Sequence, residues 1–373
     1  MSLVTPCYVI DLDRLTNNLE KILRLRWEAP CKILLALKGF STQCLLPFLL
    51  RHLDGVSASG AFEARLGKSL QATVSTFSPA YSAQTVHAVV HDSDMIVFNS
   101  VQQYKDFSNI AHRAGKSCGL RVNPEYSELP EDFGANPCQR FSRLGVLKKD
   151  MPSPRNFGAG RIEGIHLHTM CGQNADTLER MLNYLAENFD SVLRRISWIN
   201  VGGGQLYGAD DYNMELAITC IKQFSSCYNI PVFAEPCEGI LTGCGFLVTT
   251  VLDIVHNEID IAILDSSAVC HLSDAVYRDW KREVLGGGEP GQLPYAVRLA
   301  GNSCYASDFF GDYSFPQPLK RGDRVVFCDT ASYTAVKACM FNGIPLPSIG
   351  LYSENGGFQL EKQFGYRVFQ QTL

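Results

Sequence analysis

The sequence predicts an α/β chain with a second, all-β part: a (β/α)8 barrel followed by a β-sandwich or β-barrel domain. Two observations carry this prediction. Between residues 32 and 236, short apolar runs recur eight times with segments of helical spacing between them, and strand and helix alternating over about 200 residues is the pattern of a (β/α)8 barrel. From about residue 252, short β-rich runs separated by Gly and Pro clusters replace that pattern. We expect the barrel at 14–251 and the β domain at 1–13 and 252–373.

Runs that are apolar throughout predict the barrel strands, because a strand of a parallel sheet is buried on both faces. These runs are 32–38, 54–59, 72–78, 95–100, 118–123, 164–169, 198–204 and 231–236. Helical spacing predicts helices at 15–25, 62–70, 101–114, 175–189 and 214–228. The predicted strands of the β domain are 5–13, 258–265, 295–301, 324–330 and 367–371.

The composition excludes several classes of partner. The chain has 373 residues, 46% of them hydrophobic and 19% charged, with a net charge of −5, which argues against nucleic acid or a membrane surface as a partner. We see no signal-peptide pattern in the N-terminal residues, and no apolar run reaches the roughly 18 residues of a membrane span. With fourteen cysteines, we expect a cytoplasmic protein whose thiols are reduced and mostly buried.

Reactive side chains stand at the predicted carboxyl ends of the strands, where barrel enzymes carry their chemistry. They are Lys38, Arg121, His168, the glycines 202–204 and Glu235. A lysine at the mouth of a sheet is partly desolvated, which favours the neutral amine that forms a Schiff base. Glycines let backbone N–H groups approach a phosphate, an imidazole stacks on a flat ring, and a carboxylate keeps a pyridine nitrogen protonated. Together these residues predict a pyridoxal 5′-phosphate (PLP) site.

A zinc site is the competing interpretation of part of this pattern. His166 and His168 are two residues apart, so their side chains lie on one face of a strand, and Cys171 follows them. The sequence has no CxxC pair and no second ligand cluster at matching spacing. We therefore expect no metal, and a metal-dependent barrel hydrolase is kept as an alternative.

Motifs spread over nearly the whole chain resemble one family of PLP enzymes. They are TPCYVID, LLALKGF, SASGAFEA, NPCQRFSRLG, LHTMCGQNADTLE, WINVGGG, AEPCEG, AILDSSAVCHLSD, GNSCYASD and FNGIPLP. The chain resembles the PLP-dependent decarboxylases of the alanine-racemase-like fold, and within them the branch acting on carboxynorspermidine and carboxyspermidine. The resemblance implies decarboxylation of these compounds to norspermidine and spermidine, with release of CO2, in polyamine biosynthesis.

The resemblance also implies a role for each site residue. Lys38 corresponds to the Schiff-base lysine, His168 to the stacking residue and Glu235 to the partner of the pyridine nitrogen. Cys304 matches the catalytic cysteine that the other subunit supplies, which implies a homodimer with shared active sites. The remaining cofactor-binding residues implied are Arg121, Gly203, Gly204 and Tyr333, and the substrate-binding residues are Glu238, Asp274 and Asp308.

Two departures from the family pattern and several alternatives stay open. Cys237 stands where the family usually has glycine, which puts a close backbone approach to phosphate in doubt. Tyr305 stands where the family usually has leucine and ornithine-type enzymes have aspartate, which argues against ornithine as the substrate. An amino-acid racemase of the same fold is an alternative, although that branch usually has arginine in place of Glu235. A decarboxylase of diaminopimelate or another basic amino acid, and a PLP-binding protein without turnover, are others. Carboxynorspermidine and carboxyspermidine differ by one methylene, which the sequence does not discriminate.

Overall fold

The computed structural model describes residues 3–277 and 280–373, and the chain divides into two compact units. One unit is Asn18–Ile240, and the other combines Met1–Asn17 with Leu241–Leu373. The sequence-based boundaries at 14 and 251 lie near these limits. Strand β11 (Gly245–Asn257) pairs with three strands of the second unit, so residues 245–251, which we expected in the barrel, belong to the second sheet.

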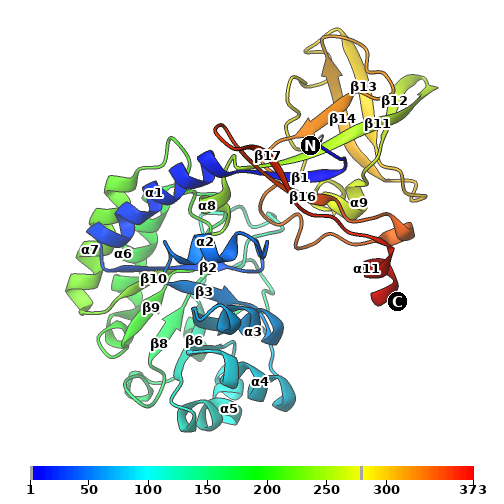
Figure 1. Cartoon of the computed structure of the whole chain (residues 1–373). Coiled ribbons are helices and arrows are strands. Elements are labelled where there is room, and N and C mark those ends of the chain that lie inside the picture. Colours follow the sequence, from blue (N-terminus) through cyan, green and yellow to red (C-terminus); the bar gives the residue numbers. More distant parts are fainter. Residues whose placement is uncertain (1–2, 278–279) are drawn as a thin grey trace. The chain divides into compact units, whose positions relative to one another are not determined.

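The first unit is a closed barrel of eight parallel strands (Figure 1). The ring closes through the β5–β6 and β10–β2 pairings, and its eight strands correspond to the eight apolar runs. Their bounds are β2 (Cys31–Ala36), β3 (Gly55–Ala58), β4 (Thr73–Phe77), β5 (Met95–Phe98), β6 (Ser117–Asn123), β8 (Gly164–His166), β9 (Trp198–Asn200) and β10 (Val232–Ala234). A two-residue strand, β7 (Val146–Leu147), pairs with β6 outside the ring.

Helices surround the barrel strands in Figure 1. They are α1 (Leu12–Glu28), α2 (Leu46–Leu50), α3 (Ala61–Ser69), α4 (Ala83–Asp92), α5 (Val101–Arg113), α6 (Ala175–Leu193), α7 (Met214–Tyr228) and α8 (Glu238–Leu241), with single turns η1 (Lys148–Asp150) and η2 (Pro154–Asn156) in the long β6–β8 connection. Strand β2 shows why these runs are apolar: the side chains of Ile33, Leu34 and Leu35 are fully buried. Each such side chain contributes about 1.5–3 kcal/mol of burial free energy.

Strand β2 ends two residues earlier than the sequence predicts. Beyond Ala36 the chain turns, with the Gly39 amide donating to the Ala36 carbonyl at 3.1 Å. Lys38 therefore lies in the turn, and its side chain is exposed. The expectation that Lys38 is partly desolvated at a strand end is wrong for this structure, because the turn carries the lysine past the apolar strands. It still lies at the carboxyl end of β2.

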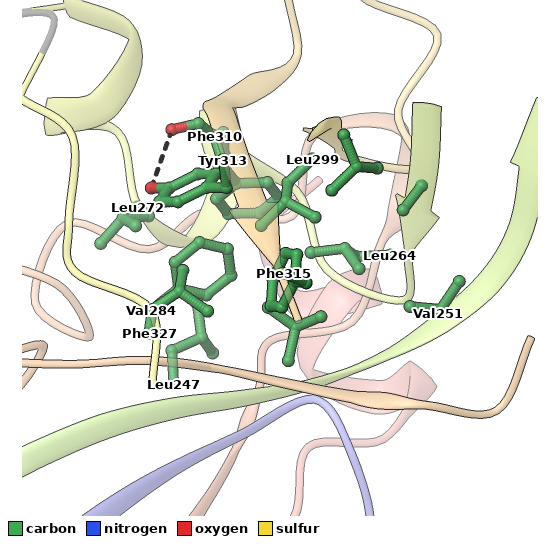
Figure 2. Close-up of a cluster of buried hydrophobic side chains, with 14 of the residues drawn as sticks. Leu247, Val251, Leu264, Leu272, Val284, Leu299, Phe310, Tyr313, Phe315 and Phe327 are labelled. Carbon is green, nitrogen blue, oxygen red and sulfur yellow. Dashed lines mark hydrogen bonds between the residues drawn. The ribbon is translucent and has the colours of Figure 1, made fainter. Parts of the chain in front are cut away.

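The second unit is an eight-stranded sheet in the order β14-β13-β12-β11-β1-β16-β17, with β15 paired to β11. The strands not yet bounded are β1 (Cys7–Asp11), β12 (Ile259–Leu264), β13 (Tyr295–Ala300), β14 (Phe309–Phe315), β15 (Arg324–Phe327), β16 (Ser348–Ser353) and β17 (Gly357–Lys362). Figure 2 shows its core, in which the rings of Phe310 and Phe327 stack with centroids 4.6 Å apart. The Tyr313 hydroxyl donates to the Phe310 and Arg282 carbonyls, so this buried ring has its polar end satisfied.

Short helices complete the second unit, and one of them corrects a predicted strand. They are α9 (Ala268–His271), α10 (Asp274–Tyr277), η3 (Phe341–Gly343) and α11 (Tyr366–Gln371). Residues 367–371 were expected to be β-rich, but they form most of α11, which begins after an extended Gly365 whose carbonyl accepts the Val368 amide. A run with only two adjacent apolar residues, Val368 and Phe369, does not carry the alternation that specifies a strand. Among the described residues, no helix is long and apolar enough to cross a bilayer.

Candidate active site

A layer of buried polar side chains crosses one end of the barrel unit. Arg121, His166 and Asn200 are register partners on the adjacent strands β6, β8 and β9, and Glu235 follows the last residue of β10. All four are at most 7% exposed. The Asn200 Nδ2 group donates to Glu235 Oε1 at 2.7 Å, and His166 Nε2 lies 3.6 Å from Glu235 Oε2. The barrel register therefore gathers this cluster around one carboxylate.

Glu235 is ionised despite its burial. Burial alone would raise its pKa, but the His166 and Lys38 charges and the Asn200 hydrogen bond hold the pKa below its usual value. Burial lowers the pKa of His166, so at neutral pH the ring is uncharged and gives little of that attraction. The ionised carboxylate then depends on Lys38 and on the amide of Asn200.

Arg121 provides a second positive charge in this layer. Its guanidinium lies 4.5 Å from the centroid of the Phe77 ring. The rings of His166 and Phe77 pack edge to face, and their centroids are 5.4 Å apart. Burial lowers the pKa of Arg121 to about 10, an effect that the Glu235 charge opposes. Arg121 is therefore still protonated at neutral pH, and Phe77 covers its cation.

His168 is held as a neutral imidazole with one defined tautomer. Burial and the charges of Lys38 and Arg121 keep its pKa well below the usual value. The Gly203 amide donates to His168 Nδ1 at 3.2 Å, so the ring proton is on Nε2. A neutral, fixed and flat ring is what stacking on an aromatic ligand requires.

The glycines after β9 are required by close backbone packing. A Cβ on Gly203 would stand 2.5 Å from the Glu235 carbonyl oxygen, and one on Gly204, where φ is +94°, would stand 2.1 Å from the Met170 carbonyl oxygen. The Gly202 amide donates to Asn200 Oδ1 at 2.9 Å. Asn200 thus ties the glycine loop to the Glu235 carboxylate through its two amide ends.

The loop after Glu235 brings further groups to Lys38. Cys237, which stands at the usual glycine position, is 4% exposed. Burial and the charge of Glu238 raise the pKa of the Cys237 thiol, whereas the charge of Lys38 lowers it. The charges of Lys38 and of Glu238, the first residue of α8, therefore both act on this buried thiol.

Four predicted site residues lie in the second unit, and two of them share one loop. Cys304 is exposed, and its amide donates to Asn342 Oδ1 at 2.7 Å. Asn342 has a left-handed backbone, with φ of 58°. Asp308, which we expected to bind substrate, is 3% exposed, and its carboxylate accepts the amides of Ser303 and Val269 at 3.1 and 3.2 Å. This geometry suits a carboxylate that fixes the loop carrying Cys304.

Asp274 and Tyr333 are joined by a lysine that sequence reasoning missed. The Lys337 ammonium lies 2.8 Å from both carboxylate oxygens of Asp274 and 5.3 Å from the Tyr333 ring centroid. Tyr333 has φ of 55°, a conformation that a bulky residue seldom adopts outside functional or strained sites. The carboxylate expected to receive a substrate amine therefore already holds a cation of its own chain.

Sequence reasoning also missed Asn200 and Asn342, and it assigned His166 only to a metal. The signal for Asn200 was its place in WINVGGG, two residues before the first glycine. In the part of the chain that the structure describes, no group of three His, Cys, Asp or Glu side chains is placed to hold a metal ion. His166 instead faces Glu235, and His168 is bonded to Gly203.

Comparisons with known proteins agree on one family. The model of the family described as "pyridoxal-dependent decarboxylase, C-terminal sheet domain" matches residues 7–331. A carboxynorspermidine/carboxyspermidine decarboxylase of Campylobacter jejuni is 35% identical, over 98% of this chain and 97% of that protein. A carboxyaminopropylagmatine decarboxylase of Synechocystis is 36% identical, over 100% and 96%. The crystal structure of carboxynorspermidine decarboxylase from Campylobacter jejuni, complexed with norspermidine, matches with a TM-score of 0.89 and 33% identity, covering both chains completely.

Proposed function

Because the chain belongs to the pyridoxal-dependent decarboxylase family, we propose that it decarboxylates carboxynorspermidine, carboxyspermidine or both, giving norspermidine and spermidine in polyamine biosynthesis. The full-length similarity to the Campylobacter jejuni enzyme carries this proposal. The fold is the alanine-racemase-like one, and PLP is the cofactor of the family. A zinc hydrolase is no longer supported.

The described residues of the barrel unit fit PLP. An exposed lysine, a neutral histidine and an ionised, buried carboxylate stand around the mouth of one barrel. Both ring nitrogens of His166 are buried without a hydrogen-bond partner. They can therefore hydrogen-bond a ligand that lies beside Glu235. When bound, PLP supplies a protonated pyridine ring that withdraws electrons from the bond to the departing carboxylate.

We assign the barrel residues as follows. Lys38 binds the cofactor covalently, and the Nε2-protonated ring of His168 stacks on it. Glu235 holds a proton on the pyridine nitrogen, and Asn200 and His166 orient the Glu235 carboxylate. Arg121, Gly203 and Gly204 complete the cofactor-binding residues of the barrel, and Tyr333 of the second unit is assigned to the same cofactor. An ionised Glu235 also favours decarboxylation over racemisation, because a carboxylate keeps the ring positively charged.

Cys304 and its loop supply the proton in this proposal. The Cys304 thiol delivers a proton to the substrate carbon that has lost CO2, in the active site of a second subunit, so the active unit is a homodimer. Asp308 and Asn342 position this loop through its backbone. Glu238 and Asp274 receive the substrate amines, and Lys337 leaves Asp274 when an amine arrives. A cytoplasmic location is part of the proposal and is supported by the fourteen cysteines, none of which forms a disulfide.

A second candidate substrate is carboxyaminopropylagmatine, since the Synechocystis relative is as similar to this chain as the Campylobacter protein is. The test is kcat/KM for carboxynorspermidine, carboxyspermidine, carboxyaminopropylagmatine and diaminopimelate with the purified, PLP-loaded protein. We expect one of the first two to be at least tenfold better than diaminopimelate. A higher value for diaminopimelate or carboxyaminopropylagmatine would replace the proposed substrate.

A further inference from the structure

Two cysteines outside the catalytic groups lie beside each other in the second unit. Cys270 is on α9, and Cys339 lies in the segment between Tyr333 and η3. The Cys339 amide donates to the Cys270 carbonyl at 3.1 Å. The Cys270 thiol donates to the Phe341 carbonyl at 3.7 Å, and the neighbouring Cys339 thiol raises the pKa of Cys270. Both are free cysteines in the structure.

The backbone contact places this pair within the range of a disulfide. A backbone hydrogen bond holds the Cα atoms of the two residues that it joins close together; in antiparallel strand pairs that exchange two such bonds, they are about 5.5 Å apart. A disulfide is formed without backbone movement when that separation is about 4.4–6.8 Å. Oxidation of the pair therefore demands little rearrangement of the two segments.

Exposure differs between the two thiols and sets the order of reaction. Cys339 is exposed, whereas Cys270 is 1% exposed. Burial and the neighbouring Cys339 raise the pKa of the Cys270 thiol to about 11, an effect that a bond to Ser267 opposes. A thiol in that state is unreactive toward an oxidant in solution. Cys339 therefore meets the oxidant first, and Cys270 resolves the product.

We propose that Cys270 and Cys339 form a reversible disulfide under peroxide. Cys339 attacks the O–O bond, which gives a Cys339 sulfenic acid and one water. The Cys270 sulfur then displaces the hydroxyl group from the Cys339 sulfur and loses its proton, giving the disulfide and a second water. Two thiols lose two electrons, one peroxide gains them, and a small dithiol restores the reduced pair.

The disulfide fixes the segment that carries Lys337. Lys337 lies two residues before Cys339 and bonds both carboxylate oxygens of Asp274, which is in the short helix after α9. A covalent link at Cys270 holds this segment against α9, so Lys337 stays on Asp274. The effect of the disulfide on substrate binding rests on the proposed role of Asp274 as a substrate ligand. Formation of the disulfide does not rest on that role.

Peptide mapping by mass spectrometry tests the disulfide. The holoenzyme is treated with a small excess of hydrogen peroxide, blocked with an alkylating reagent, and digested without reductant. We expect a cross-linked pair of peptides holding Cys270 and Cys339, which disappears with dithiothreitol and is absent in Cys339→Ser. Cys31 and Cys220, which are also neighbours but are both buried, are the internal control and stay alkylatable after unfolding. Absence of the Cys270–Cys339 link, or a link between the control pair in its place, would overturn the proposal.

Kinetics test the consequence separately. Oxidised wild type should show a KM for the polyamine substrate raised about 1.4- to fivefold, the range given by an ion pair of about 0.2–1 kcal/mol that no longer opens. The Cys339→Ser variant, treated with peroxide in the same way, is the control. It reports any loss of activity caused by oxidation of other thiols, Cys304 included, and its KM should not change. An unchanged KM in the cross-linked wild type would show that the disulfide does not affect Asp274. If no polyamine were turned over at all, the proposed function would fail while the mapping result stood.

Discussion

Asn200 joins two parts of the proposed cofactor site: its Nδ2 donates to Glu235 Oε1 at 2.7 Å, and its Oδ1 accepts the Gly202 amide at 2.9 Å. Both side chains are buried, and Asn200 is fully so. One neutral side chain therefore fixes both the carboxylate and the glycine loop. Because a buried polar group left without its partner is costly, the contact carries a measurable share of stability.

Asn200→Ala should destabilise the PLP-free protein more at neutral than at acid pH. The folded-state pKa of Glu235 lies below its usual value, so its ionised form stabilises the fold above the unfolded pKa, and that stability is lost as the pH falls through the folded pKa. Removing the amide raises the folded pKa. We expect a loss of about 1.5–3 kcal/mol at pH 7 and a smaller loss at about pH 2, where the pH approaches the folded pKa of Glu235, measured by urea unfolding. Asn213→Ala, which removes the exposed cap of α7, is the control whose loss should not depend on pH. An equal loss of stability for Asn200→Ala at both pH values would show that Asn200 does not stabilise the ionised form of Glu235.

Lys38→Ala should lose covalent retention of the cofactor. After borohydride reduction and denaturation, wild type should carry one reduced PLP adduct per chain on the peptide containing Lys38, and the variant should carry none. Lys32→Ala is the matched control, because Lys32 is exposed on β2, the strand that precedes the turn holding Lys38, and pairs with Asp54 at 3.4 Å. An adduct on another lysine in wild type would show that Lys38 is not the covalent anchor.

Lys337→Met should lower the KM for the polyamine substrate. The Lys337 ammonium occupies both oxygens of Asp274, and removing this competitor frees the carboxylate for a substrate amine. An exposed ion pair is worth about 0.2–1 kcal/mol, so the expected decrease in KM is roughly 1.4- to fivefold with kcat little changed. Asp274→Asn should raise KM. If both variants raised KM equally, Lys337 would act as a ligand of the substrate site and not as a competitor.

Mixtures of Lys38→Ala and Cys304→Ala protomers should regain activity. Each variant homodimer is expected to be inactive, but a mixed dimer contains one site with both residues intact. Random mixing puts half of the dimers in that form, which gives roughly a quarter of wild-type activity. Subunit exchange is checked with differently tagged protomers. No recovery after demonstrated exchange would assign Cys304 to the site of its own chain, or to none.

The barrel was predictable from the sequence because its strands are buried on both faces and therefore appear as uninterrupted apolar runs. Lys38, Arg121, His168, the glycine loop and Glu235 were proposed as site residues from the rule that barrel chemistry lies at the carboxyl ends of strands. The exact end of β2 was not predicted, because a turn at Gly39 and not hydrophobicity ends it. The prediction of a strand at 367–371 was wrong for a related reason. These residues lack the apolar–polar alternation of a strand, and they continue the helix that begins after Gly365.

The residues that support the site could not be predicted, because they depend on register and on contacts distant in sequence. Asn200 faces Glu235 only because β9 and β10 pair as they do, and Lys337 meets Asp274 across 63 positions of the chain. Asp308 was placed with the substrate ligands by its position four residues after Cys304. Its burial and its two backbone hydrogen bonds became visible only in the folded unit.

In the proposed function, Glu235 and Lys38 serve the decarboxylation of a carboxylated polyamine. Reaction of the PLP-loaded protein with carboxynorspermidine in deuterium oxide measures it directly, by counting CO2, norspermidine and deuterium together. The predicted result is one CO2 and one norspermidine per substrate, with a single deuterium at the carbon that lost the carboxylate, and a rate lower by on the order of a hundredfold or more in Glu235→Gln. Recovery of the substrate with deuterium at that carbon and inverted configuration, without CO2, would contradict the claim and identify a racemase.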